Sequence, residues 1–188
     1  MVRIIFLRHA EAEKKGKDRD KERLLTSHGC KQAQTIQGAL KKVNFAPDLV
    51  VVSDAGRTAQ TAALVVGGFV DTVKLPELRN MGAQEYAAVN AILTALGTET
   101  PFMQLLALDK ENFWRRHARM VANHLHDVIV EKNARQVLVV GHHYTQNAIG
   151  LALLGRDHPL LLGPLFKYAE GFMLDEKGNV THITNDSP

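Results

Sequence analysis

The chain contains 188 residues, of which 45% are hydrophobic and 23% are charged, and its formal net charge is +3. This profile is typical of an ordinary soluble globular protein, and the length fits one domain over residues 1–188. The positive balance is mild and indicates at most some attraction for anions. We expect no nucleic-acid partner, because nucleic-acid binders usually carry denser basic clusters.

Cys30 is the only cysteine, which excludes an intrachain disulfide and fits a reducing compartment. The apolar stretch at the N-terminus is short and runs directly into Arg8 and His9, so no secretory signal is expected. No window of the sequence approaches the length of a membrane span. These features predict a cytoplasmic protein without a membrane partner. An uncovered edge strand could pair two copies, so a monomer and a homodimer both stay open.

Three short apolar runs are too continuous for surface helices and are predicted to be buried, parallel strands: residues 2–7, 49–52 and 136–140. Helical spacing, caps or stop signals predict five helices between and after them: residues 27–40, 57–66, 85–96, from near 109 to 128, and 145–154. The connection over residues 98–108 has no clear pattern. A helical insert is therefore expected at about residues 82–134.

The remaining strands are a short one around residues 70–74 and a C-terminal pair, 166–174 and 180–184, which alternate around a turn as in a hairpin. Strand and helix alternate through most of the chain before this hairpin. The order of elements predicts a three-layer α/β/α sandwich, with a mostly parallel central sheet and an antiparallel C-terminal edge.

Polar side chains follow each of the three buried strands: Arg8 with His9, then Arg57, then His142 with His143. Because the carboxyl ends of parallel strands meet at one edge of a sheet, we expect these side chains to share a pocket. Such a cluster is costly to bury unless an anion binds there. Phosphate is the obvious candidate, since guanidinium groups bind it with paired hydrogen bonds and a helix N-terminus adds backbone donors.

Phosphoryl transfer requires an in-line nucleophile and positive charge around the equatorial oxygens. His9 is the predicted nucleophile, because it directly follows its strand and an unprotonated imidazole is competent near neutral pH. Arg8, Arg57 and His142 are predicted to clamp the phosphoryl oxygens, His142 as a charged donor. These roles make the pocket a candidate catalytic site.

A leaving alkoxide also needs a proton, so a carboxylic acid is expected nearby. Glu77, on the loop after the short strand predicted around residues 70–74, is the first candidate, and Glu85 is the second. His143 and Arg23 are further candidates for phosphate contacts, although each could instead be an ordinary neighbouring or solvated side chain. Arg23 ends a charged segment, residues 11–23, that could form the mouth of the site.

These residues resemble the histidine phosphatase (phosphoglycerate mutase-like) superfamily. The resemblance rests on four motifs in register: Arg8-His9-Ala10-Glu11, Leu25-Thr26-Ser27-His28-Gly29-Cys30-Lys31-Gln32-Ala33, Arg57 in a Ser-Asp-x-x-Arg-x-x-Gln-Thr-Ala setting, and Gly141-His142. Leu75-Pro76-Glu77 falls where that family carries its proton donor. The resemblance implies an α/β/α fold, a phosphohistidine intermediate on His9, and no metal or organic cofactor.

Two departures from the mutase branch affect the expected activity. Ala10 replaces a glycine and Lys15 occupies the position of an asparagine, which is similar to the small branch that includes the SixA-type phosphohistidine phosphatases. That branch is more compact than this chain, which carries the insert at about 82–134. In larger members such an insert covers the site and selects the substrate. His143 is a second departure, because the family usually has a smaller residue there.

The expected activity is hydrolysis of phosphomonoesters or phosphorylated side chains through a phosphohistidine on His9. The partner would be a small phosphorylated molecule or a phosphoprotein. A phosphoglycerate mutase-type phosphotransferase is the first alternative, and loss of the mutase-type asparagine counts modestly against it. A non-catalytic phosphate-binding module is the second, and the intact nucleophile counts against it. The sequence does not identify the substrate.

Overall fold

The computed structural model describes residues 2–14, 17–79, 83–97, 100–163 and 166–185. Its centre is a six-stranded sheet in the order β3-β2-β4-β1-β5-β6. The strands are β1 (Arg3–Arg8), β2 (Leu49–Val52), β3 (Asp71–Lys74), β4 (Gln136–Gly141), β5 (Gly171–Leu174) and β6 (Val180–Ile183). The first four strands pair in parallel, whereas β5 and β6 are antiparallel to their neighbours. The predicted sheet is confirmed, including its antiparallel C-terminal edge.

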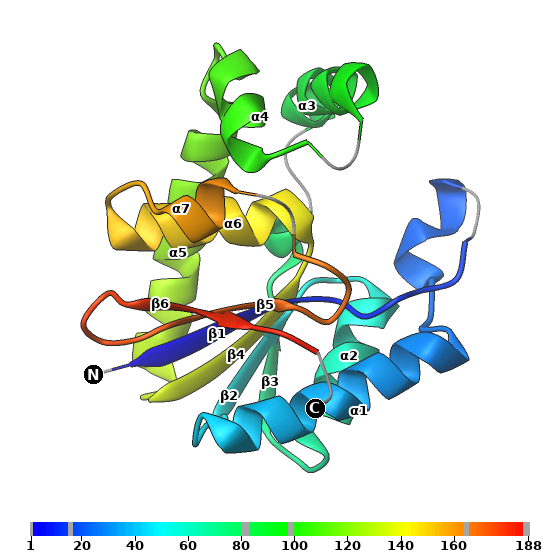
Figure 1. Cartoon of the computed structure of the whole chain (residues 1–188), viewed down its shortest axis with the longest axis vertical. Coiled ribbons are helices and arrows are strands. Elements are labelled where there is room, and N and C mark those ends of the chain that lie inside the picture. The colour runs from blue at the N-terminus through cyan, green and yellow to red at the C-terminus, as the bar shows by residue number, and fades with distance from the viewer. Residues whose placement is uncertain (1, 15–16, 80–82, 98–99, 164–165, 186–188) are drawn as a thin grey trace.

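Helices cover both faces of the sheet (Figure 1). On one side lie α1 (Ser27–Lys42) and α2 (Gly56–Val66), and on the other α5 (Phe113–Glu131) and α6 (His143–Leu154). The helices α3 (Ala83–Leu96), α4 (Phe102–Leu108) and α7 (Pro159–Leu162) lie on the α6 side, with α3 and α4 farthest from the sheet. Two 3₁₀ helices, η1 (Lys17–Glu22) and η2 (Pro76–Leu78), complete the fold. Among these described helices, none combines the length and apolar character that a bilayer span requires.

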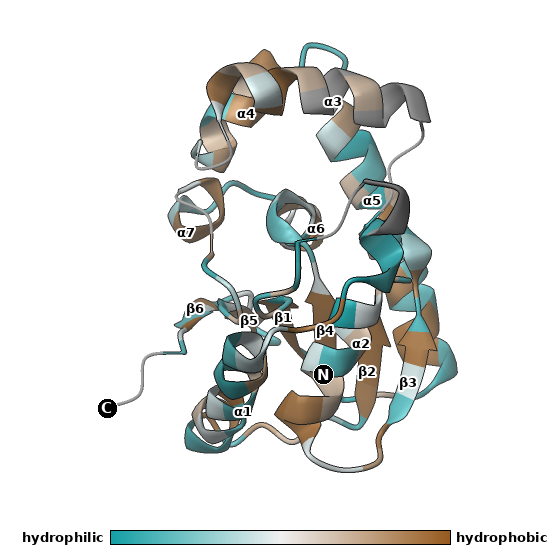
Figure 2. Ribbon diagram, turned by 90° about the vertical axis from the view of Figure 1, so that its right-hand side faces the viewer, coloured by the Kyte–Doolittle hydropathy of each residue, from teal (hydrophilic) through white to brown (hydrophobic). Residues whose placement is uncertain are grey.

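Alternating side chains of the inner strands supply the two halves of the core. Ile4 and Phe6 of β1 pack into the cluster that contains α5, whereas Ile5 and Leu7 pack into the cluster that contains α1. Both faces of a parallel sheet are covered in this way, which explains why the strands read as continuous apolar runs. Figure 2 shows the same contrast, with apolar β2 and β4 in the centre and a more polar β3 at the edge.

Helix α5 begins later than predicted. The sequence suggested a start near Asp109, but the helix starts at Phe113, after Asn112 in a left-handed conformation with φ of 54°. The carboxylate of Asp109 nevertheless accepts hydrogen bonds from the backbone N–H groups of Phe113 and Trp114, at 2.9 and 2.8 Å. Asp109 therefore satisfies the orphan donors of the first turn from outside the helix. The unassigned segment before it contains α4.

Strand β5 is shorter than the predicted strand 166–174. Ala169 has a φ of 58°, which breaks the extended conformation, and β5 begins only at Gly171. A Cβ atom at Gly171 would lie 1.8 Å from the carbonyl oxygen of Phe6, so only glycine allows this approach of β5 to β1. The residues before Gly171 form a turn beside the end of β1, and this turn contributes to the site described next.

Candidate active site

The topology brings the ends of β1, β2 and β4 together, because β4 lies between the other two strands. Arg8 is the last residue of β1 and His9 follows it. Arg57 is the second residue of α2, just after β2, and His142 is the N-cap of α6, just after β4. These side chains therefore converge on one edge of the sheet, as predicted.

Arg57 joins the two histidines at the centre of the site. Its Nε lies 3.2 Å from Nε2 of His9, and its Nη2 lies 3.5 Å from Nδ1 of His142. The centroids of the two imidazole rings are 5.1 Å apart. We call the Nε and Nη2 donors that face the histidines the inner edge of Arg57. The inner edge has the planar fork geometry that matches two oxygens of a phosphoryl group.

His9 is held in the tautomer that a nucleophile needs. Its Nδ1 lies 2.7 Å from the carbonyl oxygen of Ala10. Because a carbonyl only accepts, Nδ1 carries the hydrogen, and Nε2 keeps its lone pair towards Arg57. Burial, reinforced by the charges of Arg57 and Arg8, lowers the pKa of His9 from 6.5 to about 3, although the Ala10 contact raises it. The imidazole is therefore neutral at physiological pH.

A chain of hydrogen bonds fixes His142. Its Nδ1 accepts from Arg57, so Nε2 carries the hydrogen and donates to Ser53 Oγ at 3.0 Å. Ser53 Oγ lies 3.0 Å from Thr58 Oγ1, which donates to the carbonyl oxygen of Ala55 at 2.7 Å. Each hydroxyl in this chain can donate once in the same direction, so the chain satisfies every buried polar group in it.

The role of His142 as a charged donor to a bound phosphoryl group stays a prediction. Burial, followed by the proximity of His9 and the charge of Arg57, lowers its pKa well below 6.5. His142 is neutral in this arrangement, because its Nδ1 accepts a hydrogen bond from a guanidinium. It can contribute a lone pair or a neutral dipole to the site, and a bound phosphoryl dianion would favour its protonation.

Arg8 is a partly buried cation with an unused donor. Its Nη1 donates to the carbonyl oxygen of Phe166 at 2.9 Å, and its guanidinium stacks on the ring of Tyr168 at 3.8 Å. Its Nε is buried and has no hydrogen-bond partner within the described part of the chain. Burial lowers the pKa of Arg8 to about 10, which leaves it cationic at neutral pH. A partly buried cation with an orphan donor suits a bound anion.

Asp20 of η1 holds the opposite side of Arg57, which we call the outer edge. The carbonyl oxygen of Asp20 accepts from Nη1 at 2.6 Å, and its carboxylate accepts from Nη2 at 3.1 Å. The same carboxylate pairs with Arg23 at 3.1 Å and with Arg79 at 3.3 Å. Arg23 thus lies at the site as predicted, but its described contacts there are to Asp20 and to two backbone carbonyls.

Sequence reasoning missed Asp20, Arg79 and Tyr168. Arg79 bridges Asp20 to Asp54, whose carboxylate lies 2.8 Å from its Nε. Tyr168 covers both Arg8 and His9, with its ring centroid 5.6 Å from that of His9. Charged residues were visible in the segment before Arg23, but nothing in their pattern singled out Asp20. Tyr168 lies in a turn that the sequence assigned to a strand.

Glu77 lies at η2, and its described contacts are with α5. Its Oε1 is 3.7 Å from Nδ1 of His124, and its backbone carbonyl accepts from His117 at 2.9 Å. Over the described residues, no contact joins its carboxylate to His9 or Arg57. The role of Glu77 as the acid stays a prediction. The side chain of the second candidate, Glu85, lies outside what the structure describes, as does Lys15.

His143 is the first residue of α6 and lies beside Tyr144, with ring centroids 5.6 Å apart. Its Nδ1 is buried without a hydrogen-bond partner among the residues that the structure describes. Burial, followed by the charge of Arg8, lowers its pKa to about 3. His143 is therefore a neutral imidazole next to the site, and a direct phosphate contact by it stays a prediction.

Residues 4–169 match the family model of the histidine phosphatase superfamily, branch 1. The chain belongs to this superfamily. The family that the motifs indicated is thereby confirmed, and SixA-type phosphatases are among the structural neighbours of this histidine phosphatase family member. Comparison with curated protein sequences finds no matching relative.

Solved structures extend the likeness of this superfamily member over almost its whole length. The α-ribazole phosphatase from Shigella flexneri aligns with a TM-score of 0.65 and 18% identity, over 98% of this chain and 96% of that one. The protein histidine phosphatase SixA gives a TM-score of 0.54 and 21% identity, over 96% and 94%. A phosphoglycerate mutase from Bacillus anthracis gives 0.61 and 16%, over 98% and 93%. At these identities the likeness shows the fold, and it confirms the predicted phosphoglycerate mutase-like architecture.

Proposed function

We propose that the protein is a phosphatase that hydrolyses phosphomonoesters or phosphorylated side chains through a phosphohistidine on His9. The single observation that carries this proposal is the orientation of His9. Its Nδ1 is tied to the carbonyl of Ala10, and its Nε2 lone pair faces the inner edge of Arg57. A binding module would need the cations but not a neutral imidazole fixed with its lone pair towards them.

The described contacts support a two-step reaction. When the substrate binds, the inner-edge donors of Arg57 break their hydrogen bonds to His9 and His142 and form hydrogen bonds to oxygens of the phosphoryl group. The Nε2 atom of His9 then attacks phosphorus, the bond to the ester oxygen breaks, and the leaving oxygen takes a proton from an acid. In the second step the deprotonated acid takes a proton from water while the water oxygen attacks phosphorus, and the bond between phosphorus and Nε2 breaks. This releases inorganic phosphate and restores both neutral His9 and the protonated acid.

The cations of the site outnumber its carboxylates, which favours a phosphoryl dianion. Arg8, Arg23, Arg57 and Arg79 stand against Asp20 and Asp54, with Lys21 also paired to Asp54. The two carboxylates are committed to the outer side of this cluster. The Nε donors of Arg57 and of Arg8 have no carboxylate partner in the described structure, so they are available to a substrate.

The proposal is tested by phosphate release from p-nitrophenyl phosphate and from a panel of phosphorylated metabolites and phosphoproteins. The wild-type protein is compared with His9→Ala and with a matched control, His28→Ala, which removes an exposed histidine on α1. We expect release by wild type and control and its loss in His9→Ala. Absence of release from every substrate would contradict the phosphatase, and release that survives in His9→Ala would contradict the nucleophile.

The intermediate gives a second readout. Rapid quenching in alkali after incubation with labelled substrate is expected to trap label on His9, identified by mass spectrometry, because phosphohistidine survives alkali but not acid. Isomerisation of phosphoglycerate without net release of phosphate would instead support the mutase alternative.

The acid is identified by comparing leaving groups. Glu77→Gln is expected to slow hydrolysis of alkyl phosphates much more than that of p-nitrophenyl phosphate, whose phenolate leaves without a proton. Equal effects on both substrates would remove Glu77 from the acid role. A cytoplasmic location, and a substrate that is a small phosphorylated molecule or a phosphoprotein, complete the proposal. The insert that contains α3 and α4 is the proposed determinant of which substrate enters.

A further inference from the structure

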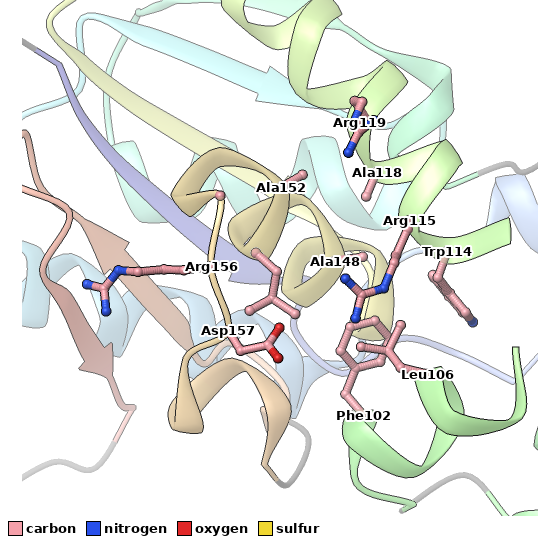
Figure 3. A pocket seen from close by; sticks show the side chains of 12 residues that line it. Phe102, Leu106, Trp114, Arg115, Ala118, Arg119, Ala148, Ala152, Arg156 and Asp157 are labelled. Carbon is pink, nitrogen blue, oxygen red and sulfur yellow. The ribbon is translucent and has the colours of Figure 1, made fainter. Parts of the chain in front are cut away.

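A second hollow of the molecule lies between α4, α5 and α6 and shares none of its lining with the site around His9 (Figure 3). Its volume is about 370 Å³. This volume falls within the range of about 300–1,000 Å³ that small-molecule sites occupy. Helix α6 passes from one site to the other, because it begins beside the catalytic cluster at His143 and ends at this cavity.

Part of the wall of the cavity is apolar. Phe102 of α4 and Trp114 of α5 are buried, and their rings meet edge to face with centroids 5.6 Å apart. On α6 the lining side chains at the cavity are mostly small, with Ala148 and Ala152 one turn apart. The apolar surface that a ligand can reach is formed by the partly exposed side chains of Leu106 and Leu151 and by the exposed Ala152. An apolar ligand body fits such a surface.

The open side of the cavity is positively charged. Arg115 and Arg119 are four residues apart on α5 and both line the cavity, and Figure 3 shows the guanidinium of Arg115 directed into it. Like charges at this spacing repel each other on a helix. Neither arginine forms an ion pair with any described residue.

Two neighbouring arginines, in contrast, have hydrogen-bond partners. Arg116 donates to the backbone carbonyl of Glu111 at 2.7 Å, and its guanidinium lies over the ring of Phe113. Arg156 also lines the cavity, but its guanidinium points away from it and donates to the carbonyl oxygen of Gly178 at 3.4 Å. Arg115 and Arg119 therefore differ from both in having no such partner among the described residues.

The carboxylate of Asp157 offsets part of the positive charge of the cavity and so limits the charge of the ligand that fits there. The carboxylate points into the cavity from the side opposite Arg115, and no ion pair joins it to a described arginine (Figure 3). Arg115, Arg119 and Asp157 together give the lining of the cavity a net charge of +1. We propose that this cavity is a binding site for a small organic monoanion with an apolar body, such as a medium-chain carboxylate. Its head group contacts Arg115 and Arg119, and its body lies along Leu106 and Leu151 beside Trp114.

Trp114 lines the cavity and is the only tryptophan of the chain, so tryptophan fluorescence can report binding there. Intrinsic fluorescence of the full-length protein is titrated with octanoate, with octanol and with acetate. We expect a saturable change with octanoate and binding weaker by about tenfold or more for the neutral alcohol and for the short anion, since each lacks one of the two recognised parts. Equal affinity for octanoate and octanol would overturn the proposal.

Variants localise the binding. Arg115→Ser with Arg119→Ser is expected to weaken octanoate by about tenfold, and Ala152→Phe is expected to reduce binding by filling the hollow. Arg116→Ser is the matched control on the same helix and is expected to leave the affinity unchanged. All three arginines are exposed, so these replacements leave the fold intact, which circular dichroism verifies. Unchanged affinity in both cavity variants would refute the site, whatever the phosphatase assays give.

Discussion

Asp20 accepts two hydrogen bonds from the outer edge of Arg57. Its backbone carbonyl oxygen lies 2.6 Å from Nη1, and its carboxylate lies 3.1 Å from Nη2. The guanidinium is thereby turned so that its inner edge faces His9 and His142. Burial opposes ionisation of Asp20, but the charge of Arg57 and the hydrogen bonds from Arg57 and Arg23 outweigh it and lower the pKa of the carboxyl. Asp20 therefore stays ionised beside the proposed anion site.

Asp20→Asn is expected to tighten the binding of inorganic phosphate. The amide keeps an acceptor for Arg57, while the loss of one negative charge near the site favours an anion by about tenfold at an effective dielectric constant of about 20. Competitive inhibition by phosphate measures the effect, and Glu22→Gln, an exposed carboxylate of the same 3₁₀ helix, is the control. Unchanged or weaker inhibition would show that Asp20 serves the site by holding Arg57 rather than by its charge.

Arg57→Lys is expected to lower kcat by about a hundredfold, although the positive charge is kept. Lysine cannot place two parallel donors on one phosphoryl group, and the loss of one preorganised transition-state donor costs about 10²–10³-fold in other enzymes. Steady-state kinetics with p-nitrophenyl phosphate provides the measurement. A change confined to KM would mean that Arg57 contributes equally to the ground state and the transition state.

Ser53→Ala is expected to reduce kcat by roughly tenfold and to cost about 1–2 kcal/mol of stability, because it leaves the Nε2 hydrogen of His142 without its acceptor. Ser53 acts here as a positioning residue. If it acts through His142, adding Ser53→Ala to a His142→Gln variant produces little further loss of activity. Additive losses in the double variant would contradict this route.

Acidification from about pH 7 to about pH 5 is expected to destabilise the protein in part through His143. The unfolded chain protonates this group near 6.5, whereas the folded chain does so only near 3. Between these values the unfolded state binds more protons, so stability falls as the pH falls, by about 2 kcal/mol for one such histidine at pH 5. Urea unfolding of wild type and His143→Gln at both values tests this. A pH-dependent loss as large in the variant as in wild type would contradict it.

Much of the fold could be predicted because its strands are buried on both faces and its helices carry clear caps. Thr26 caps α1 and accepts from the N–H of Gly29, and Gly67 and Gly155 end α2 and α6 in the left-handed conformation, as their positions indicated. The predictions failed where a local signal had a second interpretation. Asp109 does cap α5, but from three residues before the N-cap. The apolar residues after Phe166 form a turn around Ala169 before they form a strand.

The core of the site could be predicted for a different reason. Arg8, Arg57 and His142 each stand next to a strand end, so parallel pairing alone brings them together. Asp20, Arg79 and Tyr168 come from connecting segments, and their contacts depend on how those segments fold back over the sheet edge. The protonation of His142 also depends on this three-dimensional setting, because burial and neighbouring positive charge act only once the pocket has formed.

The central position of β4 sets when the protein can become active during its own synthesis. Strands β1 and β2 both pair with β4 and not with each other. A nascent chain that has not reached residue 136 already contains His9 and Arg57, but it lacks the strand that pairs with both β1 and β2. The strands that precede the proposed nucleophile and its main phosphate ligand therefore reach their final pairing only when β4 inserts between them, a late and non-local step of folding. Activity should thus appear abruptly as the ribosome releases β4, and not gradually as the chain lengthens.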